Sequence, residues 1–317
     1  MTKLRVLFAH MRDNLSGMQT RFHPLWPAYL AASVERHFGQ ETIEFRLASK
    51  DAHFEIALFK PHIVAIGSVS SQFNDAIDWA RISKQYGLAT IIGGIHISLM
   101  PQCLTKDMDV GCVGEGEETF CDLLVHFLKY GSFVPKHMAD IKGIVYRDDG
   151  KLIRTPARPL IRPFDQIPHP KRALVGYQRH DYLLGSRGCP YKCAFCSCRI
   201  FWGKPRFASA AYILEEIKEL VLNGAKIIRF EDDSLTTNVM RLRKIKELIT
   251  AQGLNQHVQF NCWARANEVT LEVVEYLKAM NVNFVWMGLE SGCQRTLDYL
   301  KGNVTVDQNR RAVTLLK

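Results

Sequence analysis

The sequence has no hydrophobic run long enough to cross a membrane, since none approaches the ~18 apolar residues of a transmembrane helix. The first ten residues read as a β-strand and lack the long apolar core of a signal peptide. The nine cysteines are odd in number, and without a secretory signal they favour reduced thiols over a disulfide framework. We therefore expect a cytoplasmic protein without a membrane segment.

The sequence also lacks a long basic run interleaved with aromatic residues, which is the usual mark of a nucleic-acid-binding surface. The formal net charge is nevertheless +9. Lysines and arginines spread singly along a chain are best read as a solvated surface. We therefore do not expect nucleic acid as a partner.

The most informative segment is a short loop that has three cysteines and lacks a fourth. Cys189, Cys193 and Cys196 follow the spacing C-x3-C-x2-C. Three thiolates on one loop can hold three irons of a [4Fe–4S] cluster and leave the fourth iron open, whereas most iron–sulfur electron carriers use four cysteines.

Zinc is the main alternative for this loop. A structural zinc site needs four ligands, usually from two C-x2-C pairs. Cys198 could be the fourth ligand, but it lies only two residues after Cys196, and no second pair or histidine pair follows. The loop therefore favours a cluster over zinc.

Two halves of the chain alternate short apolar runs with helical patterns, which is the signature of parallel α/β domains. In the first half, residues 1–135, we expect strands at 4–9, 42–47, 62–68, 89–93 and 110–113, and helices at 24–38, 72–86 and 117–129. Residues 136–177 read as a hairpin at 143–154 followed by a linker, since 155–170 contain five prolines.

The second half, residues 178–317, repeats the alternation. We expect strands at 182–184, 226–230, 258–263 and 284–288, and helices at 211–223, 242–251, 271–280 and 306–316. These elements make about four β/α units, and the last residues lie inside an amphipathic pattern. A closed barrel needs more units, so we expect an incomplete barrel that is truncated after about four of them.

The cysteine loop, Gly-Cys-Pro-Tyr-Lys-Cys-Ala-Phe-Cys-Ser, resembles the cluster loop of the radical S-adenosylmethionine (SAM) enzymes. The resemblance implies a partial (β/α)6 barrel, a [4Fe–4S] cluster on Cys189, Cys193 and Cys196, and SAM on the open iron. An electron from the cluster would cleave SAM to a 5′-deoxyadenosyl radical. Phe195 matches the aromatic residue of the family that lies beside the adenine.

The ends of the later strands supply further candidates for SAM binding, because ligand groups in such barrels gather at the carboxyl ends of the strands. Asp232 and Asp233 could hold the SAM ammonium group, or cap a helix. Arg265 could pair with the SAM carboxylate or the substrate, or form an ion pair with Asp232 or Glu290. Glu290 and Ser291 lie in Gly-Leu-Glu-Ser-Gly, which is similar to the family segment whose glutamate contacts the ribose.

The first half resembles the Rossmann-like (flavodoxin-like) cobalamin-binding domain that precedes the barrel in one radical SAM subgroup. The motifs that carry this resemblance are Gly-Gly-Ile-His, Gly-Glu-Gly-Glu-Glu-Thr-Phe and Asp-Gln-Ile-Pro in the linker. Small residues at strand ends would leave a slot for the cofactor. The implied cobalamin-binding residues are Ser68, Ser70, Gly93, Gly94, His96, Gly114 and Glu115.

One motif of many cobalamin domains is missing. Domains of the methionine synthase type carry Asp-x-His-x-x-Gly after the first strand, and its histidine ligates cobalt. Here residues 10–17 read His-Met-Arg-Asp-Asn-Leu-Ser-Gly, so no histidine stands at that position. We expect cobalamin to bind without a protein ligand below the cobalt; the alternative is a flavodoxin-like domain with an empty cleft.

Together these features predict a cobalamin-dependent radical SAM enzyme, and the resemblance favours methyl transfer to an unactivated carbon. Cyclisation, ring contraction or another rearrangement occurs in the same subgroup and stays open, as does an iron–sulfur electron-transfer module without turnover. We expect a small-molecule or peptide substrate and an electron donor such as flavodoxin or ferredoxin.

Overall fold

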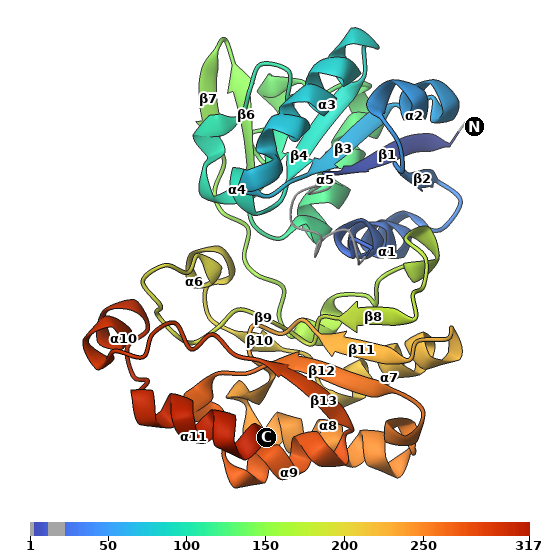
Figure 1. Ribbon diagram of the computed structural model, residues 1–317. Coiled ribbons are helices and arrows are strands. Elements are labelled where there is room, and N and C mark those ends of the chain that lie inside the picture. Colours follow the sequence, from blue (N-terminus) through green and yellow to red (C-terminus); the bar gives the residue numbers. More distant parts are fainter. Residues whose placement is uncertain (1–2, 12–22) are drawn as a thin grey trace. The chain divides into compact units, whose positions relative to one another are not determined.

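The computed structural model describes residues 3–11 and 23–317, which form two compact units (Figure 1). The first unit reaches Ile161 and includes Ile167–Gly176, whereas the second comprises Arg162–Gln166 and Tyr177–Lys317. The sheet of the first unit is mostly parallel with an antiparallel edge, and the main sheet of the second unit is parallel throughout.

The first unit is built on a seven-stranded sheet in the order β2-β1-β3-β4-β5-β6-β7. Neighbouring strands from β2 to β5 are parallel, whereas β6 pairs antiparallel with β5, and β7 with β6. All five residues of β3 are buried, as expected of a central strand covered on both faces. The strands are β1 (Leu4–His10), β2 (Ile43–Leu47), β3 (Ile63–Gly67), β4 (Ala89–Gly93), β5 (Val110–Cys112), β6 (Ile144–Asp148) and β7 (Lys151–Arg154).

Helices cover both faces of this sheet (Figure 1). On one face, α1 and α5 pack over Phe8, Ile63 and Ile91, and on the other α3 and α4 pack over Val64 and Ile66. The alternation of the strand residues between two apolar clusters gives the doubly covered sheet its core. The helices are α1 (Trp26–Phe38), α2 (Ala52–Phe59), α3 (Phe73–Gln85), α4 (Ile95–Leu99) and α5 (Gly116–Tyr130).

The hairpin that we assigned to the linker is part of the first sheet. Its strand β6 pairs with β5 through Val110 opposite Tyr146, and Ile144, Val145 and Tyr146 are buried in the core. The apolar residues of β6 pack into the core when the hairpin joins the edge of the sheet at β5. A solvent-exposed linker would not need apolar residues. The connecting segment is therefore shorter than we expected.

The second unit contains a four-stranded parallel sheet in the order β13-β12-β11-β8. A short antiparallel ribbon pairs β9 (Ser186–Arg187) with β10 (Arg206–Phe207). Along the sequence it lies between β8 and the first long helix of this unit, Ala210–Leu222. This order matches the four β/α units expected from the sequence. The strands of the sheet are β8 (His180–Leu183), β11 (Ile227–Phe230), β12 (Gln259–Trp263) and β13 (Val282–Trp286).

The helices α7, α8 and α9 lie along one face of this sheet (Figure 1). Each presents apolar residues at helical spacing, such as Ile213, Ile217 and Leu220 of α7. They cover the strand residues that point the same way, including Ile228, Phe230 and Phe260, which are fully buried. The helices of the unit are α6 (Cys198–Trp202), α7 (Ala210–Leu222), α8 (Val239–Ala251), α9 (Leu271–Ala279), α10 (Gln294–Leu300) and α11 (Val306–Leu316).

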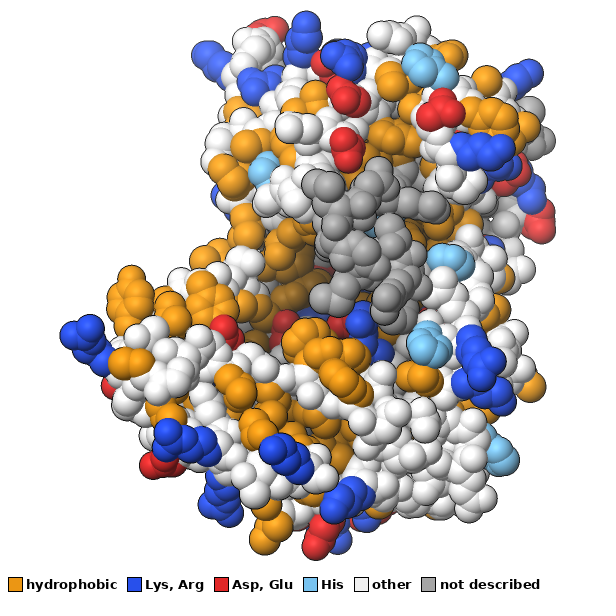
Figure 2. Space-filling view, in the orientation of Figure 1, with side chains coloured by type: hydrophobic (Ala, Val, Ile, Leu, Met, Phe, Trp, Pro, Cys, Tyr) orange, Lys and Arg blue, Asp and Glu red, His pale blue; other side chains and the backbone are white. Residues whose placement is uncertain are grey.

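The opposite face of the sheet carries large and polar side chains. Trp263 stacks on Trp286 with ring centroids 5.4 Å apart, and the guanidinium of Arg229 lies 5.5 Å from the Trp286 ring. Phe284 is 52% exposed. Figure 2 shows apolar side chains gathered over β12 and β13 on the visible face. This face is therefore lined by aromatic side chains of β12 and β13 and by Arg229.

The short elements α2, α4, α6 and α10 were not predicted. In α2 the apolar residues surround the helix and form no single stripe, so the periodicity that identifies a helix is weak. The Asp51 side chain accepts a hydrogen bond from the Phe54 amide and starts this helix.

No helix of the described residues combines the length and apolar character that spanning a bilayer requires.

Candidate functional site

The three cysteines lie on the loop between β9 and α6, just beyond the carboxyl end of β8. The loop begins at Gly188, whose φ of +95° strains any residue with a side chain and whose neighbours Pro205 and Trp202 would crowd a Cβ at 3.2 Å. A backbone bond from the Cys196 amide to the Cys193 carbonyl, at 3.1 Å, tightens the loop. We call residues 188–197 the cysteine loop.

The donor set of this loop fits a cubane cluster better than zinc. Within residues 3–11 and 23–317, no three cysteine, histidine or acidic side chains converge on a point where they could hold one metal ion. A [4Fe–4S] cluster does not need such a point, because each thiolate binds a different iron. Cys198, the possible fourth zinc ligand, instead donates its S–H to Asp233 at 3.1 Å.

Asp233 holds the start of the cysteine loop. Its Oδ2 accepts hydrogen bonds from the Gly188 amide at 3.0 Å and from the Cys198 thiol. Desolvation by the surrounding atoms raises the pKa of this carboxyl. Asp233 remains exposed, so it can hold the loop and still face a ligand.

Asp232, which we expected to bind the SAM ammonium group, is instead fully buried in the fold. Its Oδ1 accepts from the Gly185 amide at 2.8 Å, and its Oδ2 pairs with Arg241 at 3.0 Å. Arg241 also donates to the carbonyls of Gly185 and Ala208. The reason is that the two neighbouring carboxylates point to opposite sides of the strand end, and only Asp233 faces the loop.

Arg265 follows β12 and reaches the cysteine loop, not Asp232 or Glu290 as we considered. Its Nη1 donates to the Cys193 sulfur at 3.3 Å, and its guanidinium lies 3.8 Å from the centre of the Tyr191 ring. Its Nη2 donates to the carbonyls of Lys301 and Gly302. The side chain is only 5% exposed, so it ties the middle of the loop to the chain that follows α10.

Glu268 is a site residue that the sequence analysis missed. It lies on the short helix Ala266–Glu268 and accepts hydrogen bonds from four hydroxyl groups. One comes from Tyr191 of the cysteine loop at 2.7 Å, and the others come from Ser234, Thr236 and Thr237 after β11. The carboxylate therefore joins three chain segments. Its only signal in the sequence is an acidic residue shortly after a strand end.

Glu290, Ser291 and Phe195 are accessible. Glu290 has φ +62°, and its carboxylate lies 3.5 Å from the Lys301 amine and so close to Gly288 that a side chain there would collide. Ser291 Oγ accepts from the Cys293 amide at 3.0 Å. Phe195 is 58% exposed on the cysteine loop. These three side chains are available to a ligand.

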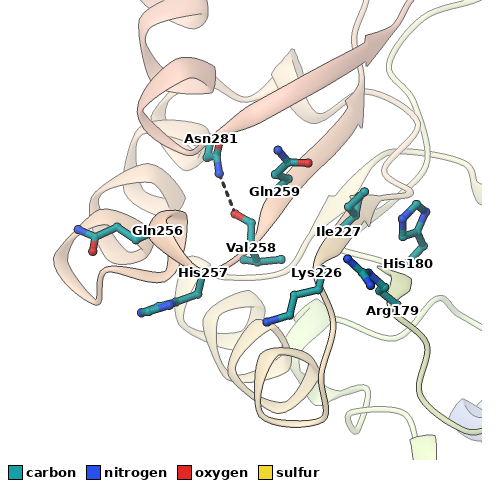
Figure 3. Close-up of a pocket in the computed structure, with 9 residues that line it drawn as sticks. All are labelled: Arg179, His180, Lys226, Ile227, Gln256, His257, Val258, Gln259 and Asn281. Carbon is teal, nitrogen blue, oxygen red and sulfur yellow. Dashed lines mark hydrogen bonds between the residues drawn. The ribbon is translucent and has the colours of Figure 1, made fainter.

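A pocket of about 360 Å³ lies at the other end of the same sheet (Figure 3). Its lining comes from the residues at which the strands begin: Arg179, His180, Lys226, Ile227, Gln256, His257, Val258, Gln259 and Asn281. The cysteine loop follows the carboxyl end of β8. Because the strands are parallel, this pocket is separated from the cysteine loop by the length of the sheet, and we assign it no part in that site.

The first unit has the strand order in which flavodoxin-like domains bind ligands, at the carboxyl ends of the strands where the order reverses. The reversal lies between β1 and β3, where His10 pairs with Gly67. Trp26 lies against this point, because a Cβ on Gly67 would come within 2.6 Å of its ring. The Trp26 indole donates to His10 Nδ1 at 3.2 Å. Residues 12–17 of the expected loop motif lie outside the described residues.

The neighbouring strand ends, where we expected the slot, carry two buried polar atoms without a partner among the described residues. Gly94 has φ +104°, and a Cβ there would collide with the Ser68 carbonyl, so only glycine fits. Ser68 Oγ and His96 Nε2 are both buried without a hydrogen-bond partner in the described part of the chain. Buried polar atoms normally have partners. The slot therefore fits a ligand that brings hydrogen-bonding groups, as cobalamin does.

The remaining residues expected at this slot differ in their roles. Ser70 Oγ lies 2.9 Å from His96 Nδ1 and orients the imidazole, and burial lowers the pKa of that ring. Glu115 accepts from the Ile161 amide and fastens the start of the linker. A side chain on Gly93 would meet only Cys112, and one on Gly114 would meet nothing.

Two family models match the chain, and their boundaries follow the two units. The B12 binding domain matches residues 12–124, and the Radical SAM superfamily matches residues 183–317. The chain belongs to the B12-binding radical SAM enzymes. The cofactors of this enzyme are therefore a [4Fe–4S] cluster, SAM and cobalamin.

Its similarity to known proteins extends along the whole chain. An uncharacterized methyltransferase from Pyrococcus horikoshii is 31% identical over 93% of the chain and 66% of its own length. An anaerobic magnesium-protoporphyrin IX monomethyl ester cyclase from Cereibacter sphaeroides is 25% identical over 99% of the chain and 55% of its own length. The chain thus spans between half and two thirds of these relatives.

The fold is shared with a solved structure of a cobalamin-dependent S-adenosylmethionine radical enzyme, OxsB, with aqua-cobalamin bound. The TM-score is 0.80 at 19% identity, over 99% of this chain and 48% of that one. At this identity the likeness establishes the fold alone.

Proposed function

We propose that this enzyme transfers a methyl group from SAM to an unactivated carbon of a small molecule or peptide. One observation carries the proposal: the same chain holds a three-thiol loop and a small-residue slot in which Ser68 Oγ and His96 Nε2 are buried without partners. When bound, the cluster would supply an electron, one SAM a methyl group, a second SAM a radical, and cobalamin a carrier for the methyl group. The methyltransferase from Pyrococcus horikoshii supports this reaction class.

The proposal gives each accessible side chain a task. Cys189, Cys193 and Cys196 bind the cluster, and Asp233 receives the SAM ammonium group on its exposed side. Phe195 lies beside the adenine, and Glu290 with Ser291 receives the ribose hydroxyls. An opposite-charge contact at Asp233 is the strongest of these, since hydrogen bonds to ionised groups are shorter and stronger than neutral ones.

The proposal gives the first unit the task of holding cobalamin. Ser68 and His96 donate to or accept from its polar groups, Gly94 lets the Ser68 backbone approach closely, and Gly93 lies beside them at the end of β4. Ser70 orients His96 through the 2.9 Å contact to Nδ1. A one-electron donor such as flavodoxin or ferredoxin completes the system, and the +9 charge of the chain favours an acidic donor.

The test begins with anaerobic reconstitution using iron and sulfide, followed by incubation with methyl-labelled SAM, dithionite and cobalamin. We expect about four irons per chain, release of 5′-deoxyadenosine, and label that stays with the protein-bound cobalamin. Cys193→Ala should abolish 5′-deoxyadenosine formation. Cys198→Ala is the matched control, because it removes a thiol two residues beyond the trio and should keep the irons.

A second reaction class, cyclisation, is favoured by the cyclase relative that covers 99% of the chain. The same experiment separates the two. Release of 5′-deoxyadenosine with no label on cobalamin would favour a cyclase or another rearrangement over methyl transfer. Failure to bind iron would contradict both reaction classes, methyl transfer and cyclisation. It would also mean that the cysteine loop does not bind a cluster.

A further inference from the structure

The guanidinium of Arg265 carries a buried positive charge that pairs with no carboxylate of residues 3–11 and 23–317. In the part of the chain that the structure describes, its acceptors are Asn267 Oδ1, two backbone carbonyls and the Cys193 sulfur, and it forms no ion pair with a carboxylate. The side chain is 5% exposed. Burying a charge costs free energy unless another group compensates it. An anionic group beside Arg265 would therefore stabilise the buried guanidinium.

The Cys193 sulfur is that neighbour once the cluster is bound, because metal binding requires the thiolate form. Hydrogen bonds to the sulfurs and the net charge around a cluster are two of the factors that set its reduction potential. Reduction by a one-electron donor adds one negative charge. A cation 3.3 Å from a ligand sulfur stabilises the reduced state more than the oxidised state.

We propose that Arg265 tunes the cluster, raising its reduction potential through the hydrogen bond to Cys193. Arg265 acts as a positioning and tuning residue, not as a ligand. The proposal rests on the presence of the cluster and goes beyond methyl transfer, since a potential is measured without SAM, cobalamin or substrate. Failure of the proposed function would therefore leave this proposal testable.

The geometry explains why Arg265 stays at the sulfur. The Tyr191 ring lies 3.8 Å from the guanidinium carbon on one side, an attraction between a cation and an aromatic face. The Tyr191 hydroxyl is fixed in turn by Glu268 at 2.7 Å. The carbonyls of Lys301 and Gly302 hold the other nitrogen at 3.1 and 2.8 Å. Three separate segments thus aim one N–H group at Cys193.

The test is an anaerobic redox titration of the reconstituted full chain, monitored by electron paramagnetic resonance of the reduced cluster. We compare the native chain with Arg265→Gln, Arg265→Lys and Arg243→Gln. Arg243 is a surface residue paired with Glu247, so its substitution removes the same charge far from the loop. Iron and sulfide analysis accompanies each titration.

We expect Arg265→Gln to lower the ratio of reduced to oxidised cluster about tenfold at a fixed potential, which corresponds to about 59 mV for one electron. Arg265→Lys keeps the positive charge but lacks the planar guanidinium geometry. Its reduction potential should lie between those of the native chain and Arg265→Gln. Arg243→Gln should leave the potential unchanged. An Arg265→Gln cluster with four irons and the native potential would overturn the proposal. So would loss of the irons from both Arg265 variants, since Arg265 would then only hold the loop.

Discussion

Charged side chains at the strand ends of the second unit divide their work between the fold and the cofactor site. Asp232 is consumed by the buried pair with Arg241, whereas its neighbour Asp233 faces the cysteine loop. Arg265 reaches Cys193 rather than a carboxylate. Charge alone, read from a sequence, therefore does not distinguish a residue that builds the site from one that binds the ligand.

Replacing Asp232 with alanine should destabilise the second unit strongly. The substitution leaves Arg241 buried without its carboxylate, and removal of one partner of a buried pair costs about 3–5 kcal/mol. Hydrogen exchange of β11 and α8 amides in the native state measures the change in opening free energy. Glu247→Gln is the control, because it removes exposed pairs with Arg243 and Lys244, each of which is worth at most about 1 kcal/mol. Equal effects of the two substitutions would contradict this assignment.

The cysteines of the cluster-free protein should differ widely in reactivity. Burial raises the pKa of Cys112 and Cys262 to about 12, so neither forms much thiolate at neutral pH. Cys293 is exposed, and hydrogen bonds from Thr296 lower its pKa. Alkylation with iodoacetamide, followed site by site with mass spectrometry, should label Cys293 early and the two buried thiols last. Early labelling of Cys262 would show that the sheet opens readily.

At the scale of elements, long strands and amphipathic helices are predictable from the sequence. β4 and α11 begin and end at the residues expected, because buried strands read as apolar runs and α11 carries a capping box at Thr305 and Gln308. The short helices are not predictable in this way, because five to eight residues are too few to show the helical period of apolar residues. The hairpin strand β6 was placed in the linker because local patterns do not reveal which edge a strand joins.

The junction of β2 and α2 should make stability depend on pH. Glu55 is fully buried; burial raises its pKa, but hydrogen bonds from the Ser49 amide and hydroxyl and from Arg46 outweigh this and lower it below 4.5. A lowered folded pKa means that the stabilisation is present above the unfolded pKa and is lost as pH falls through the folded value. The stability difference between the native chain and Glu55→Gln should be about 1–3 kcal/mol near neutral pH and shrink below pH 4.5. A difference that does not change with pH would contradict this role.

The turn between β4 and α4 should be essential for cobalamin. A Cβ at Gly94 collides with the Ser68 carbonyl at a φ of +104°, so Gly94→Ala must displace Ser68 from the slot. We expect cobalamin affinity, measured by spectral titration, to fall at least about tenfold, or 1.4 kcal/mol. Gly39→Ala is the matched control, because Gly39 has φ +80° but open space around it. It should show only the backbone strain, about 1–3 kcal/mol of stability, with unchanged cobalamin affinity.

At the scale of the molecule, the assembly of two α/β units was predictable, because each carries its own alternating pattern and its own motifs. The anchors of the cysteine loop were not. Glu268 and Tyr191 are 77 residues apart, and no spacing rule connects them. The contact appears only when the sheet brings the loop that follows β8 and the segment that follows β12 to the same edge, on either side of β11.

The two cofactor sites should load independently, because the residues assigned to each lie within one unit. Cys193→Ala should lose the irons and keep cobalamin, and Ser68→Ala should weaken cobalamin and keep about four irons. Iron analysis and the cobalamin spectrum after gel filtration test both variants in the full chain. Loss of both cofactors from either variant would show that one site supports the other.

The four hydroxyls gathered on Glu268 have a consequence for how the enzyme acquires its metal. The Glu268 carboxylate accepts all four hydrogen bonds only when the cysteine loop, the segment after β11 and the segment after β12 are in their folded positions. Because these contacts join protein groups alone, we expect folding to order the loop at Tyr191 without iron, so that part of its conformational entropy is lost before the cluster binds. Cluster insertion then resembles docking into a finished receptor, unlike the zinc fingers that fold only around their metal.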